Sequence, residues 1–181
     1  DLRGVVEKAL PATKASPNDA APARRRARYA AGKVGKRTIA SYVKEDGVDP
    51  SRETETLVEV KLGVQNWRWA GVPFVLRSGK ALAHKREEIV VTFKDVPHLP
   101  TGLSGHPAPT QLRICLTPNG LSLDLNVNGG GDPFSLDRIT LDTDFADGEL
   151  PPYGEVLAGI LSADPTLSVR DDAVEQCWRI V

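Results

Sequence analysis

Apolar and polar residues alternate along the middle of the chain with a period of two. In the first of these runs, Val58, Val60 and Leu62 share one side of the chain while charged residues occupy the other, which is typical of a half-buried strand. Similar runs follow at residues 74–77, 88–93, 112–116, 121–127 and 138–141. The pattern predicts about six consecutive strands.

A turn signal separates two of these runs. Residues 117–121 read Thr-Pro-Asn-Gly-Leu, and proline followed by Asn-Gly between alternating runs is a strong short-range signal for a β-hairpin. We therefore expect neighbouring strands to pair in the antiparallel sense at this point.

The period changes to 3.6 residues at both ends of the chain, which indicates helices. Residues 2–10 carry a short apolar face that ends at Pro11. Two further apolar faces follow Pro152, the first made by Val156, Leu157, Ile160 and Leu161 and the second by Ala173, Val174, Cys177 and Trp178. Strands grouped together, with helices at the ends, indicate an α+β fold and not an alternating nucleotide-binding fold.

The segment between the first helix and the first strand has a different composition. Residues 11–42 are rich in Ala, Pro, Lys and Arg and show little periodicity, which favours a surface linker over a core element. We expect residues 1–50 to form an N-terminal helix and a basic, partly mobile linker, and residues 51–181 to form the α+β domain. Both ends look truncated, since the sequence begins inside a helical pattern without Met and stops without a polar tail.

Composition and charge argue against several classes of function. The chain has 181 residues and a formal net charge of −1, which removes any overall electrostatic case for nucleic acid or an anionic membrane as partner. No apolar run approaches the roughly 20 residues of a membrane span, and the N-terminus does not resemble a signal peptide. Two cysteines make no disulfide framework, so we expect a soluble, cytoplasmic protein.

Several short motifs have an ordinary structural interpretation. The glycine-rich stretches at residues 129–134 and 32–38 lack the spacing of a dinucleotide or phosphate loop. The basic run at residues 24–28 has no interleaved aromatic residues, and it reads as a solvated face and not as a nucleic-acid patch.

The histidines and cysteines likewise indicate no chemistry of their own. His84, His98 and His106 are too scattered for a metal site, and no carboxylate cluster accompanies them. Cys115 falls in a strand pattern and Cys177 on an apolar helix face, so both are expected to be core thiols. The three tryptophans are expected to be packing residues.

A basic loop follows the run at residues 74–77. Lys80 and Lys85 flank the segment Ala-Leu-Ala-His, which comes shortly after Gly79. A glycine after a strand allows a sharp turn that would bring two ammonium groups onto one anion such as phosphate, through charge-assisted hydrogen bonds and without a metal. Lysines between strands are more often solvated, so the residues alone leave both interpretations open.

A longer resemblance supports the anion-binding interpretation of this loop. Residues 52–94, with Asn-Trp-Arg-Trp-Ala-Gly-Val-Pro-Phe, Leu-Arg-Ser-Gly-Lys and Glu-Ile-Val-Val-Thr-Phe in order, resemble the C-terminal domain of glucose-6-phosphate dehydrogenases. Residues 112–123 resemble the next hairpin of that family, and residues 153–181 resemble its late helix pair. A fainter match covers residues 27–32.

The resemblance implies a large, mainly antiparallel sheet with helices packed on one side, which in this family also forms much of a homodimer interface. It implies an enzyme that oxidises glucose 6-phosphate to 6-phosphogluconolactone with NADP, in the pentose phosphate pathway. Lys80 and Lys85 match two positive side chains that hold the sugar phosphate in the family. We therefore expect this pair to bind the substrate.

The resemblance also marks what is missing from this sequence. The NADP fingerprint, catalytic motifs and general base of the family belong to an N-terminal domain that has no counterpart here. We therefore name no catalytic, cofactor-binding or metal-binding residue, and we expect the chain alone to be inactive. Thr117 stands where the family has a glutamine that reaches the sugar, so sugar specificity can differ. A second, structural NADP is not expected.

Two other functions remain compatible with the sequence. The chain can be a diverged module that binds sugar phosphates without catalysis. It can also be a purely structural dimerisation module, in which the basic loop binds nothing.

Overall fold

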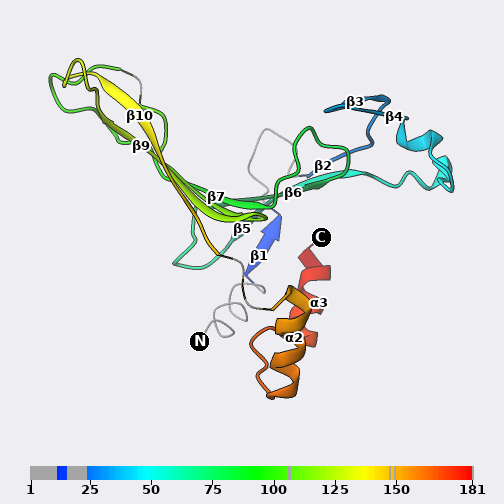
Figure 1. The fold of residues 1–181 in the computed structure, drawn as a ribbon. Helices are drawn as coiled ribbons and strands as arrows, with labels where there is room; N and C mark the ends of the chain where they lie inside the picture. Colours follow the sequence, from blue (N-terminus) through cyan, green and yellow to red (C-terminus); the bar gives the residue numbers. More distant parts are fainter. Residues whose placement is uncertain (1–11, 16–23, 106, 147, 149, 181) are drawn as a thin grey trace. The chain divides into compact units, whose positions relative to one another are not determined.

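The computed structural model describes residues 12–15, 24–105, 107–146, 148 and 150–180. The helix expected at residues 2–10 lies outside these ranges. The described strands are β1 (Thr13–Ala15), β2 (Arg24–Ala27), β3 (Gly32–Val34), β4 (Arg37–Ile39), β5 (Leu57–Val64), β6 (Pro73–Gly79), β7 (Glu88–Thr92), β8 (Gln111–Leu116), β9 (Asn119–Asn128) and β10 (Leu136–Asp144). The described α-helices are α2 (Pro152–Leu161) and α3 (Asp171–Ile180), and short 3-10 turns cover Tyr42–Lys44 and Pro50–Arg52 (Figure 1).

The chain folds as two compact units. The first contains Asp1–Ala83 and Val156–Val181, and the second contains His84–Glu155. Strands β1 to β6 and helix α3 belong to the first unit, strands β7 to β10 belong to the second, and α2 spans the division. The domain boundary that the sequence predicts at residue 50 stays a prediction.

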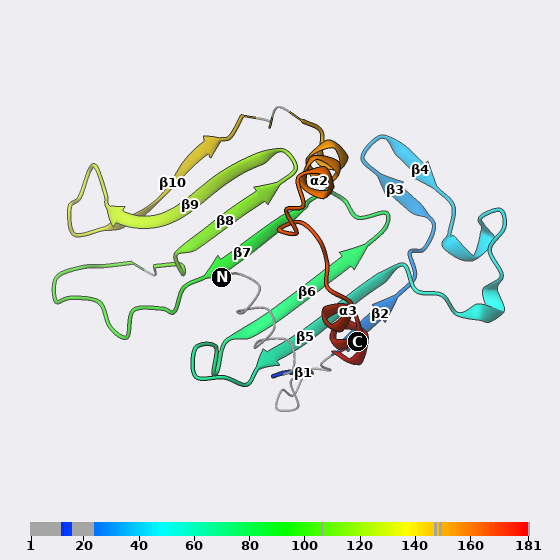
Figure 2. The same ribbon diagram turned by 90° about the horizontal axis from the view of Figure 1, so that it is seen from below.

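Strand β5 is the centre of the sheet in the first unit. Strand β6 pairs along one of its edges and β1 and β2 pair along the other, all antiparallel (Figure 2). The alternation seen in the sequence directs Val60 and Leu62 into a small core, which Ile180 at the end of α3 completes. Burying such side chains removes apolar surface from water, and this stabilises the docking of α3 on β5.

The opposite face of β5 carries a row of charges. The strand register aligns Arg25 of β2, Glu59 of β5 and Arg77 of β6. The Glu59 carboxylate lies 3.7 Å from Arg25 Nη1 and accepts a hydrogen bond of 2.6 Å from Arg77 Nε. Within the segment expected to be a basic surface linker, residues 24–27 form an exposed strand, because pairing with β5 and a facing carboxylate stabilise an extended conformation there.

The second unit is a four-stranded antiparallel meander in the order β7, β8, β9, β10 (Figure 2). Its register places aliphatic side chains on one face, in two rows that cross the strands. The first row is Val91, Leu112, Leu123 and Leu141, and the second begins with Ile89, Ile114 and Leu121. Side chains alternate across a strand, so the polar residues Arg113, Ser122, Asp124 and Thr140 share the other face.

The hairpin expected between β8 and β9 is confirmed, but its turn differs from the prediction. Leu116 pairs with Asn119, which leaves Thr117 and Pro118 as the two turn residues, and the peptide bond between them is cis. Asn119 and Gly120 open β9 instead of forming the turn. The turn therefore presents the Thr117 side chain at the end of the sheet.

The α+β class, the six central strands and the two C-terminal helices are confirmed. The burial predicted for aromatic and cysteine side chains is partly wrong. Trp69 packs edge-on against Phe74 with ring centroids 5.4 Å apart, whereas Trp67 and Trp178 are exposed. Cys177 is exposed as well. Neither described α-helix has the length and apolar character needed to cross a membrane.

Candidate functional site

Lys80 follows the end of β6 in the first unit. Its backbone N–H donates a 2.8 Å hydrogen bond to the carbonyl of Thr56. A Cβ at Gly79 would lie 2.8 Å from Leu57 Cδ1, so glycine lets the end of β6 pack closely against the Leu57 side chain. Ala81 then takes a positive φ of 56°, so the left-handed backbone position of this turn is Ala81 and not Gly79. The Lys80 side chain is exposed and forms no ion pair within the described ranges.

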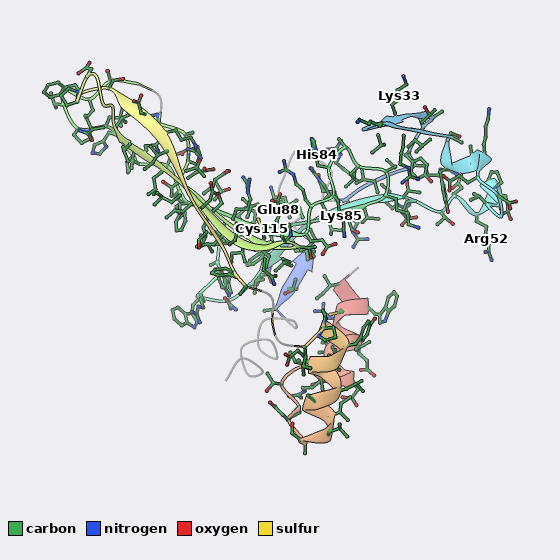
Figure 3. The ribbon with its side chains drawn as sticks, viewed as in Figure 1. Lys33, Arg52, His84, Lys85, Glu88 and Cys115 are labelled. Carbon is green, nitrogen blue, oxygen red and sulfur yellow. The ribbon has the colours of Figure 1, made fainter. Side chains whose placement is uncertain are left out.

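Lys85 lies two residues into the second unit. Its ammonium nitrogen is 3.3 Å from Glu87 Oε1, and its side chain is 79% exposed. The neighbouring His84 is also exposed (Figure 3). The joint action of Lys80 and Lys85 on one anion therefore stays a prediction, because the two lysines belong to separate units.

Glu87 connects Lys85 to the turn between β8 and β9. The Thr117 hydroxyl donates a 2.7 Å hydrogen bond to Glu87 Oε2, while Glu87 Oε1 faces Lys85. The Leu116 N–H donates to the Glu87 carbonyl at 2.7 Å, which ties the backbone of this segment to the end of β8. The hydrogen bond from Thr117, followed by the hydrogen bond and charge of Lys85, lowers the pKa of the Glu87 carboxyl.

Glu88 opens β7 beside this group and neutralises two other cations. Its carboxylate lies 3.4 Å from Arg86 Nη1 and 3.5 Å from Arg113 Nε. The strand register sets Glu88 opposite Cys115, and the two lie close together (Figure 3). Both arginines therefore have a carboxylate partner that is separate from the partner of Lys85.

These side chains line a pocket of about 320 Å³ within the second unit. Its lining is Lys85, Arg86, Glu87, Glu88, Cys115, Thr117, Pro118, Gly120, Leu121, Ser122, Asp142, Thr143 and Asp144. The volume is at the lower end of the range for small-molecule sites. The lining combines two cationic side chains with four carboxylates and several hydroxyls, which can form hydrogen bonds with a hydroxylated ligand.

Sequence reasoning found part of this site and missed part of it. Lys85 and Thr117 were singled out, and the structure brings them together although 32 residues separate them in the chain. Glu87 was not predicted as a site residue, although a carboxylate two residues after the candidate Lys85 could have indicated an ion pair. Cys115 was expected in the core, yet it is half-buried and lines the pocket. Among the described residues, no group of three His, Cys, Asp or Glu side chains is arranged to hold a metal ion.

The fold defines a class of protein, an α+β domain of mainly antiparallel sheets with a pocket beside a hairpin turn. Residues 3–181 match the family described as glucose-6-phosphate dehydrogenase, C-terminal domain, and the chain belongs to this family. It is 40% identical over 157 residues to glucose-6-phosphate 1-dehydrogenase of Mycolicibacterium smegmatis, covering 83% of this chain and 31% of that protein. It is 35% identical over 158 residues to the enzyme of Aggregatibacter actinomycetemcomitans, covering 84% and 32%.

Solved structures support the same family. A crystal structure of glucose-6-phosphate 1-dehydrogenase from Mycobacterium avium superposes with a TM-score of 0.74 at 33% identity, covering 97% of this chain and 35% of that one. A glucose-6-phosphate dehydrogenase in complex with glucose 6-phosphate superposes with a TM-score of 0.73 at 24% identity, covering 96% and 35%, and shows the shared fold. The chain spans about a third of the length of the relatives it matches.

Proposed function

We propose that this chain is the substrate-contacting and dimer-forming domain of an NADP-dependent glucose-6-phosphate dehydrogenase. The complete enzyme would move a hydride from C1 of glucose 6-phosphate to the nicotinamide of NADP. The proton of the C1 hydroxyl would pass to a general base, and 6-phosphogluconolactone would be released. The N-terminal domain would supply the base and bind NADP, so this chain alone would not turn over substrate.

One observation carries the proposal. Lys85, which the family resemblance assigns to the sugar phosphate, and Thr117, which stands at the position assigned to the sugar, both contact Glu87 in one pocket. Two positions selected from separate parts of the sequence thus converge on one place within the second unit. A ligand with a phosphate and a hydroxylated ring would satisfy both.

The proposed role of Lys80 and Lys85 is to hold the phosphate and so orient the sugar. Hydride transfer requires C1 to lie near the nicotinamide within a narrow range of geometry. A cation that holds the distant phosphate restricts the position of C1 without contacting the reacting bond. Because the Lys85 side chain is 79% exposed, solvent screens its charge, and its contribution would be about 1 kcal/mol, or roughly fivefold in affinity.

The apolar face of the second-unit sheet supports the proposed homodimer. Ile89 and Leu141 on this face are 52% and 53% exposed, and Val91 and Ile139 are exposed too. A row of aliphatic side chains on a sheet face favours burial against a partner. Most of the residues that line the pocket lie on the polar face of this sheet. A second copy that docks on the apolar face would therefore leave the pocket open to substrate.

Steady-state kinetics on the complete polypeptide that contains residues 1–181 would test the enzymatic proposal. We expect glucose 6-phosphate oxidation with NADP, and a KM for the sugar phosphate that rises about fivefold in Lys85→Ala. Lys80→Ala should act in the same direction. Lys94→Ala is the control, because Lys94 is an exposed lysine that does not line the pocket. Binding of glucose 6-phosphate without turnover would favour a diverged binding module, and activity with unchanged KM in both lysine variants would refute their proposed role.

Sedimentation of the same polypeptide would test the homodimer. A dimer at micromolar concentration is expected, and Leu141→Asp should shift it toward monomer because a charge would enter the apolar face. A monomeric wild-type protein at that concentration would contradict the proposal.

A further inference from the structure

Glu87 holds the two polar groups that a phosphorylated sugar would use. Its Oε1 lies 3.3 Å from the Lys85 ammonium, and its Oε2 accepts the Thr117 hydrogen bond at 2.7 Å. The other cations near the pocket have different carboxylates, since Glu88 faces both Arg86 and Arg113. Lys85 therefore has a carboxylate partner of its own, and an anion that binds Lys85 would meet the negative charge of that partner.

We propose that Glu87 sets the affinity of the pocket for phosphoryl groups by competing with them for Lys85. The inference rests on the proposed function, in which Lys85 contacts the phosphate. In the ligand-free protein the carboxylate pairs with the ammonium. An incoming phosphoryl group takes over this ammonium and must either displace the carboxylate or lie close to a like charge.

The charges around the pocket favour competition over assistance. Its lining contains two cationic side chains, Lys85 and Arg86, and four anionic ones, Glu87, Glu88, Asp142 and Asp144. Two unit charges 4 Å apart in water repel by an energy that corresponds to a roughly fivefold change in affinity. Removing the negative charge of Glu87 should therefore tighten phosphate binding about three- to tenfold.

The test is calorimetric titration of inorganic phosphate into the complete polypeptide. Glu87→Gln keeps the size of the side chain and an oxygen for the Thr117 hydrogen bond, but it removes the charge. We expect it to bind phosphate three- to tenfold more tightly than wild type. The gain in affinity should disappear in the double variant Lys85→Gln, Glu87→Gln. It should also become smaller near 1 M salt, where the Debye length is about 3 Å.

Asp124→Asn is a matched control from the same sheet. Asp124 accepts a 2.6 Å hydrogen bond from the Thr140 hydroxyl and lies 3.3 Å from Arg138 Nη2. It reproduces the contacts of Glu87 but does not line the pocket. Phosphate affinity should therefore be unchanged in Asp124→Asn, and an equal gain there would refute a local effect of Glu87.

The possible outcomes separate this inference from the proposed function. Phosphate binding that is equal or weaker in Glu87→Gln overturns the competition and leaves the phosphate role of Lys85 standing. A gain that persists without Lys85 also overturns it. If neither wild type nor Glu87→Gln binds phosphate or glucose 6-phosphate, the proposed phosphate site fails and the inference fails with it.

Discussion

Replacing Ile180 with alanine should destabilise the first unit by about 2 kcal/mol. Ile180 is 8% exposed and packs with Val60 and Leu62 of β5. Truncation to alanine removes three carbon atoms, worth about 0.8 kcal/mol each, and leaves a cavity that adds to the loss. The better helix propensity of alanine offsets about 0.4 kcal/mol of this loss. Because the residue lies near the end of a helix, the surrounding chain can partly relax into the cavity.

Urea unfolding of this chain, followed by far-ultraviolet circular dichroism, would measure the effect. With a slope of about 2 kcal/mol per molar urea, the midpoint should fall by about 1 M. Val174→Ala in the same helix is the control, because Val174 is 42% exposed and its loss should cost under about 0.5 kcal/mol. Equal midpoints for the two variants would refute the conclusion that Ile180 docks α3 onto β5.

Three further predictions concern polar contacts. The Tyr29 hydroxyl donates a 2.6 Å hydrogen bond to Glu45, which raises the pKa of Tyr29 to about 12. The stability that this bond contributes should be complete below pH 10 and lost between pH 10 and 12. Ultraviolet titration of Glu45→Gln should show a lower pKa for Tyr29. Thr117→Val should raise the pKa of Glu87 toward its ordinary value, as carboxyl NMR would detect, since the Thr117 hydrogen bond is the largest cause of the lowering. Stability from Glu87 is present above its ordinary pKa and lost as the pH falls through the lowered value. Glu59→Gln should reduce the free energy of unfolding by about 1 kcal/mol, and less in high salt, whereas no change at low salt would show that the charge row is energetically neutral.

The central strands and the two helices could be predicted because their periods follow directly from burial. The residues of strand β5 alternate between the core and a charged face, and this alternation can be read directly from the sequence. Strand β2 could not be predicted in this way, since Arg24–Ala27 contains no buried position. Its extended form depends on hydrogen bonds to β5 and on the Glu59 carboxylate, which lie 30 or more residues further along the chain.

The candidate site was predictable to the same limited degree. Family resemblance selected Lys80, Lys85 and Thr117, but no local pattern indicates that Thr117 and Lys85 share a carboxylate. That contact requires the β8 to β9 turn to return to the start of β7, which is a property of the sheet register. The exposure of Trp178 was missed for the opposite reason, because an apolar helix face indicates burial without identifying what buries it.

The two faces of the second-unit sheet place a strict demand on strand length. Along β9, Leu121 and Leu123 belong to the apolar face while Ser122 and Asp124 belong to the polar one. A single inserted or deleted residue would exchange these sets, carrying a carboxylate to the apolar side and a leucine toward the pocket. Individual side chains in β9 can therefore change more freely than the number of residues it contains, and insertions should be tolerated in pairs or in the loops.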